Sequence, residues 1–370
     1  MQNIDMGALA SQVLWAAFAL SVVFGAVAQR THFCTMGAVA DIVNIGDWSR
    51  MRMWALAIGV AMLGFNAMVA AGWIDAGKTI YAAPRLTWLS AIVGGAMFGF
   101  GMVLASGCGS KTLVRIGGGN LKSVVVFVVL GVAAFATLKG ITGVVRVATI
   151  DRAALELAGG QDLPSLVARA LGLAKPQVAL WLGALLGGGL VAWALARREG
   201  RSSDVLLGGA GIGAVVAAMW WVSGRLGYVV EDPNTLQEAF VATNSQRMES
   251  LSFVAPIANT IDWLLFFSDK SKLLTLGIVS TVGVVVGSAL WALAGRSFRW
   301  EGFAGAEDTA NHLVGATLMG VGGVAALGCT VGQGLSGVST LAIGSFIALA
   351  SIIAGAVLAL RYQIWRVERT

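Results

Sequence analysis

The stretch GGAMFGFGMVLASGC at residues 94–108 is repeated later in the chain as GATLMGVGGVAALGC at residues 315–329. Seven of the fifteen aligned positions are identical, and they include four glycines and the final cysteine. Both stretches are apolar and rich in small residues, which let helices approach closely inside a membrane. The repeat predicts a membrane protein in which Cys108 and Cys329 occupy equivalent positions.

The composition supports the same class. The 370 residues are 57% hydrophobic and only 12% charged, with a mean hydropathy of +0.80. A soluble domain carries about 25% charged residues. We therefore predict an all-α polytopic membrane protein in contact with the lipid bilayer. The excess of 25 Lys and Arg over 19 acidic residues is interpreted as an orientation signal, and no nucleic-acid partner is expected.

Apolar windows of about 20 residues predict membrane spans along the whole chain. About nine are expected, at residues 11–29, 53–72, 88–106, 123–143, 177–195, 203–222, 273–293, 312–327 and 339–360. Three apolar pieces are too short to cross alone and predict re-entrant or broken helices, at 35–46, 109–118 and 251–267. Residues 144–176 and 223–250 are too polar to span; we expect periplasmic loops there, with an amphipathic surface helix in the first.

Basic residues are denser in the short segments that follow the odd-numbered spans, for instance Arg50, Arg197 and Arg296. Short cytoplasmic segments of membrane proteins are enriched in Lys and Arg. The pattern predicts a periplasmic N-terminus and a cytoplasmic C-terminus.

A second alignment supports an internal repeat, because residues 39–48 match 254–263 at six positions. The chain is predicted to be one transmembrane transport domain over residues 1–370, with repeat halves 8–143 and 203–360 joined by a linker, 144–202. A single linking span would invert the second half, and inverted-repeat transporters bind substrate where broken helices of both halves meet. Cys108 and Cys329 would face each other there. Cys34 has no such partner, since Glu249 aligns with it.

The three cysteines are the only ones in the chain, and small residues surround them. Gly107, Gly109 and Gly328 would permit a backbone break beside Cys108 and Cys329. A break starts a new helix, whose free N–H groups attract anions. Arg30 and Gln333 lie four residues from a cysteine. The predicted substrate-binding and transport residues are Cys34, Cys108, Cys329, Gly107, Gly109, Gly328, Arg30 and Gln333.

Other interpretations of three thiols exist. Buried cysteines often act as small apolar side chains. Three thiolates also suit Cu(I) or Zn, but the chain has no C-x-x-C and only His32 and His312. We expect no metal site, no cofactor and no catalytic residue. A membrane sulfurtransferase that carries a cysteine persulfide is a further alternative, and it would need an accessible thiol of low pKa.

The motifs together resemble a known family. Arg-x-x-Phe-Cys-x-x-Gly at residues 30–37, Ser-Gly-Cys at 106–108 and Leu-Gly-Cys at 327–329 are similar to those of the YeeE/YedE family of bacterial sulfur-compound permeases. The resemblance implies an hourglass-shaped, multi-pass inner-membrane protein that takes up thiosulfate and is not an enzyme. It implies that Cys34, Cys108 and Cys329 pass the ion along by weak S–H···S hydrogen bonds. It also implies a small cytoplasmic TusA-like sulfur carrier as partner. One branch of the family is linked to selenium metabolism, so a selenium or another sulfur species is the alternative substrate.

The chemistry agrees with that implied substrate. The terminal sulfur of thiosulfate is a weak acceptor, and a thiol is a weak donor. Weak contacts at successive sites let an ion enter without being trapped. Protonated thiols suit this role better than thiolates, which would repel a dianion.

Overall fold

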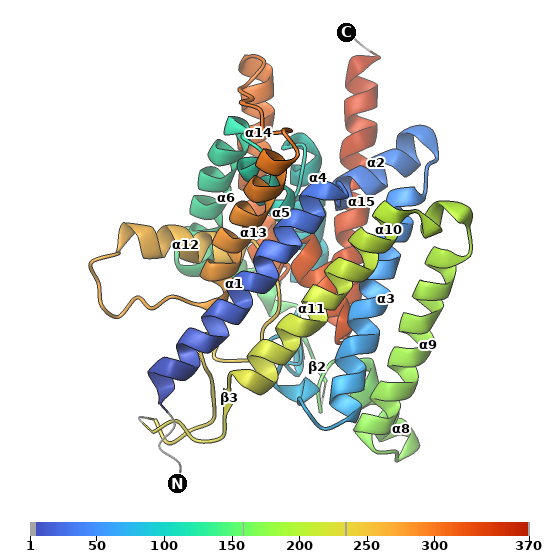
Figure 1. Cartoon of the computed structure of the whole chain (residues 1–370), viewed down its shortest axis with the longest axis vertical. Coiled ribbons are helices and arrows are strands. Elements are labelled where there is room, and N and C mark those ends of the chain that lie inside the picture. The colour runs from blue at the N-terminus through green and yellow to red at the C-terminus, as the bar shows by residue number, and fades with distance from the viewer. Residues whose placement is uncertain (1–4, 158, 234, 369–370) are drawn as a thin grey trace.

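The computed structural model describes residues 5–157, 159–233 and 235–368, and most of them are helical (Figure 1). The α-helices are α1 (Met6–Arg30), α2 (Thr35–Ile45), α3 (Ser49–Ala70), α4 (Trp88–Leu104), α5 (Gly109–Gly117), α6 (Leu121–Lys139), α7 (Ile141–Ala148), α8 (Leu163–Leu171), α9 (Lys175–Leu195), α10 (Ser203–Leu206), α11 (Ile212–Trp221), α12 (Ala255–Leu265), α13 (Leu276–Ala294), α14 (Ala306–Ala325) and α15 (Ile343–Val367). Short 3-10 turns are η1 (Ala76–Lys78), η2 (Ile150–Arg152) and η3 (Arg198–Arg201), and π-helical turns are η4 (Leu207–Gly211), η5 (Val222–Leu226) and η6 (Gly332–Gly337).

Eight helical stretches in the described part of the chain are long and apolar enough to cross a membrane. They confirm the predicted all-α polytopic class. The expected span at 312–327 lies in α14, which is 20 residues long but whose first two turns are polar, with Glu307, Asp308 and His312 among them, and which is not among the eight. The total of nine spans stays a prediction.

The three short apolar pieces form the short helices α2, α5 and α12. The third apolar piece starts before its helix, because residues 251–254 form no regular secondary structure and α12 begins at Ala255. The last span also begins later than 339, at Ile343. Leu341 has a φ of 62°, which ends the preceding helical turn and redirects the chain into α15.

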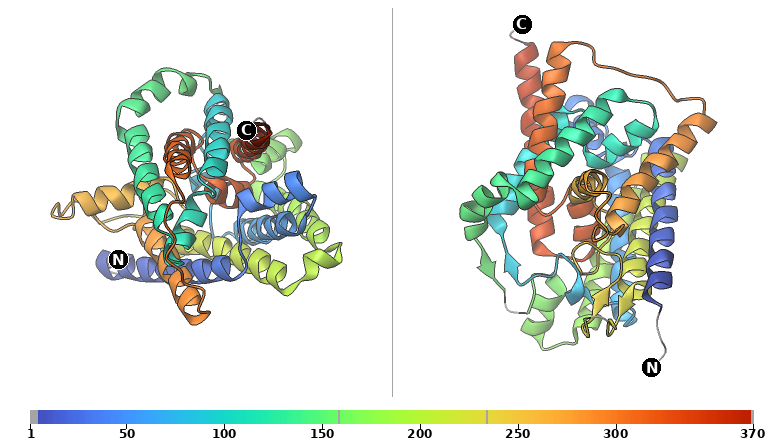
Figure 2. Two further views of the ribbon diagram at one scale, coloured as in Figure 1. Left: turned by 90° about the horizontal axis from the view of Figure 1, so that it is seen from above. Right: turned by 90° about the vertical axis from the view of Figure 1, so that its left-hand side faces the viewer.

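The two polar segments lie at the same end of the molecule as the N-terminal end of α1, and the C-terminus lies at the opposite end (Figures 1 and 2). The first segment contains α7, η2, β2 (Leu155–Glu156) and α8 in place of one amphipathic helix. Its strand β2 pairs antiparallel with β1 (Arg85–Leu86). In the second segment β3 (Tyr228–Val229) pairs with β4 (Ala239–Phe240). The first sheet joins the first polar segment to the loop before α4, and the second sheet connects two parts of the second polar segment.

The glycines of the repeated stretches lie where helices touch. Helix α4 packs against α14 and α15, and α14 packs against α6. A Cβ on Gly101 would lie 2.6 Å from the Gly315 carbonyl oxygen, and a Cβ on Gly315 would lie 2.6 Å from that of Gly101. Gly99 faces the backbone of α15 and Gly320 that of α6, at corresponding places. This equivalence agrees with an internal repeat; its inverted arrangement stays a prediction.

Candidate functional site

Each cysteine immediately precedes a short helix. Cys34 is the N-cap of α2 and Cys108 that of α5, while Cys329 precedes the helical residues 330–339 that contain η6. The exposed fractions of the three residues are 7%, 1% and 0%. All three thiols are therefore inside the bundle, at the positively polarised ends of helices.

The same backbone turn leads into each cysteine. The residue two positions before it has a positive φ, namely 52° at His32, 56° at Ser106 and 57° at Leu327. In each turn the next N–H bonds to a carbonyl five residues back: Phe33 to Ala28, Gly107 to Met102 and Gly328 to Gly323, at 3.2, 2.8 and 2.8 Å. This is the hydrogen bond of a Schellman helix end. The long helices α1, α4 and α14 therefore end in the same kind of turn, and in each case a cysteine immediately precedes the next helix.

The turn geometry corrects the reason given for the flanking glycines. The residues that adopt the left-handed conformation are His32, Ser106 and Leu327, not Gly107 or Gly109. Gly107 lies close to a side chain, since a Cβ there would lie 3.0 Å from Cγ of Lys111. Gly109 has room, with its nearest atoms 3.6 Å away in Phe253. Gly328 has a φ of 157°, next to the left-handed turn residue. Direct contact of these glycines with substrate stays a prediction.

The sulfur atoms of Cys34 and Cys329 act as helix caps. The Gly37 N–H donates to Sγ of Cys34 at 3.4 Å, and the Gly332 N–H donates to Sγ of Cys329 at 3.4 Å. Sγ of Cys108 lies 3.2 Å from Oγ of Ser110. A thiol has one weak donor and a weak acceptor. Where the sulfur accepts from its own helix, the S–H hydrogen is left to donate to another group.

Cys108 occupies the middle of the cysteine set. Its thiol lies within electrostatic range of both Cys34 and Cys329. Cys34 is also within range of Lys111 and Arg115, and Cys329 is within range of Tyr81. The fold therefore assembles thiols from distant parts of the sequence, with cations toward Cys34 and a phenol toward Cys329.

The cations beside Cys34 come from α3 and α5. A Cβ on Gly37 would lie 2.5 Å from Nη1 of Arg50, and Arg50 also pairs with Asp41 at 3.3 Å. Lys111 and Arg115 are half-buried on one face of α5, and the described residues place no carboxylate within ion-pair distance of either. The region can stabilise an anion near Cys34.

Arg30 has a different environment. Its Nη1 bonds to Asp204 at 2.8 Å, and its guanidinium lies 6.0 Å from the centre of the Trp291 ring. Its predicted role in attracting the anion stays a prediction, since the structure pairs it with an exposed acid.

Several buried polar atoms around the cysteines have no hydrogen-bond partner. The hydroxyls of Thr35 and Thr330, each next to a cysteine, are in this group, as is Oε1 of Gln333. Nε2 of Gln333 donates to the Ala326 carbonyl oxygen at 2.5 Å. This bond holds the side-chain amide of the predicted residue in place, while Oε1 of the same amide has no hydrogen-bond partner. Buried polar groups are normally bonded, and these atoms are available to a bound ion or to water.

The other side of the site is closed by a segment that includes the start of the predicted apolar piece 251–267, although no site role was expected for it. We name residues 248–254 the outer strap. Met248, Leu251 and Phe253 in it are at most 1% exposed, and the Phe253 N–H points toward Sγ of Cys329. The Leu251 carbonyl accepts from Ser336 at 2.7 Å. The run Leu251–Val254 is apolar, and that was the available signal.

Two titratable residues, Tyr81 and the outer strap's Glu249, also lie on this side of the site. Tyr81 is buried and its hydroxyl donates to the Gly332 carbonyl oxygen at 2.6 Å, at the start of η6. Burial raises the pKa of the Tyr81 hydroxyl, which therefore stays protonated. Burial also raises the pKa of the Glu249 carboxyl, although its Oε1 accepts from the Ser245 N–H at 2.7 Å. A neutral Glu249 is compatible with a nearby anion.

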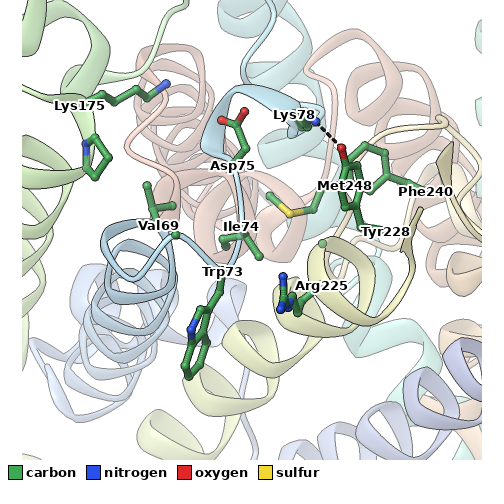
Figure 3. Close-up of a pocket in the computed structure, with 13 residues that line it drawn as sticks. Val69, Trp73, Ile74, Asp75, Lys78, Lys175, Arg225, Tyr228, Phe240 and Met248 are labelled. Carbon is green, nitrogen blue, oxygen red and sulfur yellow. Dashed lines mark hydrogen bonds between the residues drawn. The ribbon is translucent and has the colours of Figure 1, made fainter. Parts of the chain in front are cut away.

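A cavity of about 360 Å³ lies outside the strap, among Lys78, Arg225, Tyr228 and Met248 (Figure 3). Nζ of Lys78 donates to the Tyr228 hydroxyl at 2.8 Å and also bonds to Glu238. Burial lowers the pKa of Lys78, but these hydrogen bonds outweigh it and the net shift is upward. Arg225 has no carboxylate within ion-pair distance in the described chain. The buried Met248 of the strap lines this cavity.

The described residues contain no group of three or more His, Cys, Asp or Glu side chains placed to hold a metal ion. The arrangement instead offers uncharged donors, helix ends and isolated cations. These are the means by which proteins bind small anions.

Comparison with known proteins agrees with this chemistry. A model of the sulphur transport family matches residues 30–358. The chain is 26% identical over 336 residues to the thiosulfate transporter TsuA of Escherichia coli, covering 90% of this chain and 89% of that protein. It is also 26% identical over 351 residues to the TsuA of Spirochaeta thermophila, covering 93% and 97%. A probable transporter, YedE of Salmonella typhimurium, matches over 101 residues at 29% identity, 27% of this chain and 23% of that protein. The chain therefore belongs to the YeeE/YedE sulphur transport family.

Proposed function

We propose that this protein is a permease of the bacterial inner membrane that takes up thiosulfate. The observation that carries the proposal is the common geometry of Cys34, Cys108 and Cys329, each buried at the start of a short helix. Two relatives that match nearly the full chain are named thiosulfate transporters. The protein acts by transport and makes or breaks no covalent bond.

The thiols transfer the ion by successive weak hydrogen bonds. At Cys34 and Cys329 the sulfur accepts from a helix N–H, so the S–H is available to donate to the ion. The ion is held by neutral donors and helix ends. No single contact is strong, so the ion moves on.

The direction follows from the proposed orientation. The ion would collect in the outer cavity near Arg225, pass the strap, and meet Cys329, Cys108 and Cys34 in turn. Lys111, Arg115 and Arg50 would then receive it at the cytoplasmic end. A small TusA-like carrier protein would accept the sulfur compound there.

A membrane sulfurtransferase is the alternative from another class. It would need a thiol that a donor can reach and attack. The three cysteines are at most 7% exposed, which favours transport. A selenium species would use the same pathway, because its larger terminal atom is also a weak acceptor.

The test is uptake of ³⁵S-thiosulfate into liposomes that contain the purified protein. We expect uptake that unlabelled thiosulfate inhibits more strongly than sulfate or sulfite at equal concentration, with selenium analogues measured alongside. Uptake equal to that of empty liposomes would overturn the proposal. A persulfide found by mass spectrometry on any of the three cysteines after incubation with thiosulfate would favour the sulfurtransferase instead.

A further inference from the structure

A cationic pocket lies at the junction of α6 and α7, away from the cysteines. Helix α6 ends at Lys139, Gly140 turns the chain, and α7 begins at Ile141. A cavity of about 570 Å³ lies there, and three of the residues that line it are Lys139, Arg146 and Arg152. In the left view of Figure 2 the green segment after α6 curves around the outside of the bundle.

The charges in this pocket are unbalanced. Nε of Arg146 pairs with Asp151 at 3.0 Å, and Asp151 also accepts from Ser90 at 2.5 Å. Lys139 and Arg152 are exposed, and in the described residues no carboxylate lies within ion-pair distance of either. Three cations thus face one acid, which favours an anionic ligand.

The surface beside the pocket is apolar. Ile141 and Val144 of α7 are 77% and 69% exposed, and Val145 and Val147 are 55% and 56% exposed. Helix α7 starts two residues after a stretch able to cross the membrane. Basic side chains at the end of a span lie at the level of lipid headgroups, and exposed apolar faces there contact acyl chains. A free phosphate ion would make no use of these side chains.

We propose that this pocket binds an anionic phospholipid. Its phosphate lies between Lys139 and Arg152, and its acyl chain lies along Val144. Arg146 holds α7 against the bundle, since its Nη1 donates to the Val324 carbonyl oxygen at 3.5 Å. The site is formed before the lipid arrives, and it does not depend on the transport proposal.

The experiment uses the full chain, purified and delipidated in detergent. Phosphatidylglycerol and phosphatidylcholine with identical acyl chains, and inorganic phosphate, are titrated separately, with binding measured by native mass spectrometry. We expect phosphatidylglycerol to bind more tightly than phosphatidylcholine. The variant K139Q/R152Q should lose about 10- to 30-fold in affinity for phosphatidylglycerol, since each basic residue near a membrane surface contributes about 1 kcal/mol. The charge-matched control R198Q/K270Q should keep it.

Equal binding of the two lipids, or unchanged phosphatidylglycerol affinity in K139Q/R152Q, would overturn the proposal. Thermal stabilisation by inorganic phosphate alone, as large as that by phosphatidylglycerol, would also overturn it and identify a free-anion site. Thermal unfolding without lipid checks that the variants fold. If the double variant does not, K139Q and R152Q singly should each lose about fivefold.

Discussion

At the residue scale, Cys34 and Cys329 would combine two roles in one side chain under the proposed function. Sγ of Cys34 and of Cys329 satisfies a helix N–H at 3.4 Å, while the S–H remains free to donate. A serine in the same place would also cap the helix, but its hydroxyl is a smaller, stronger donor. A comparison of the Cys→Ser and Cys→Ala variants at the same position therefore distinguishes the effect of losing the helix cap from the effect of losing the proposed ion contact.

Replacing Cys329 should reduce transport without unfolding the protein. A hydrogen bond of ordinary strength contributes about 0.5–1.5 kcal/mol, so Cys329→Ala should lower the initial rate of thiosulfate uptake about two- to tenfold. Cys329→Ser should keep stability closer to that of the native chain, because the helix cap is retained. Liposome uptake and thermal unfolding in detergent measure the two effects. Full uptake by Cys329→Ala would contradict the relay.

Lys111 should matter through its charge. It is half-buried beside Cys34 and within electrostatic range of it, with no acidic partner in the described residues. Lys111→Gln should lower uptake several-fold and weaken its dependence on ionic strength, because a cation that attracts the ion is lost. Lys111→Arg should largely restore uptake, and Arg198→Gln, on an exposed turn, serves as the control. Equal loss in the Arg and Gln variants would indicate a packing role instead.

Glu249 should make uptake depend on pH. Burial raises the pKa of its carboxyl above the ordinary value of about 4.3, so the neutral form persists to a higher pH. As pH rises through that pKa, the new carboxylate repels thiosulfate and uptake should fall. Glu249→Gln should remove this decline. Uptake measured from pH 5 to 8 outside the liposomes tests it, and the same profile in both proteins would refute the assignment.

At the element scale, the helix ends and the helix contacts are made by different residues. His32, Ser106 and Leu327 adopt the left-handed turn conformation that stops a long helix two residues before each cysteine. The glycines mostly serve contact between backbones, as at Gly101 and Gly315. Glycine richness in the repeated stretches is thus explained by α4 and α14 lying against each other.

Adding one methyl group at such a contact should destabilise the bundle. A Cβ on Gly99 would overlap the Ile352 carbonyl, whereas a Cβ on Gly188 in α9 would meet nothing within 4 Å. Gly99→Ala should lower the free energy of unfolding by about 1–3 kcal/mol through overpacking. Gly188→Ala should be neutral or stabilising, since Ala favours a helix over Gly by about 1 kcal/mol. Thermal unfolding in detergent compares the two, and equal midpoints would contradict the close approach of α4 and α15.

At the scale of the whole molecule, the two ends differ. The end near the N-terminus carries the short sheets and the outer cavity, while the C-terminus lies at the opposite end (Figures 1 and 3). The outer strap runs from Met248, which lines the cavity, to Phe253, which lies beside Cys329. On the pathway proposed above, an ion would pass along this strap.

The predicted orientation has a direct test. An epitope inserted at Gly302, after the basic residues Arg296 and Arg299, should bind antibody only in inside-out vesicles. An epitope at Gln246, in the second polar segment, should bind in intact spheroplasts. Both sites are outside the long helices, so insertion should be tolerated. Reversed accessibility would invert the direction proposed for the pathway.

Much of the fold follows from the sequence because the relevant signals are local. Apolar length predicts the spans, and three apolar pieces too short to cross a membrane predict α2, α5 and α12. The cysteines were recognisable as site candidates because each lies at an interruption of an apolar stretch. The π-helical turn η6 and the position of the outer strap beside Cys329 were not predictable, because the first has no distinct pattern of hydrophobicity and the second depends on packing between distant segments.

The sequence by itself determined the membrane class, the broken helices and the cysteines that follow them, since composition and spacing act over short distances. Only the tertiary structure decided which groups surround those cysteines. Phe253 reaches Cys329 and Tyr81 reaches Gly332 across long separations in sequence, while Arg30 pairs with Asp204. Such partners depend on how whole helices pack, and no local pattern encodes them.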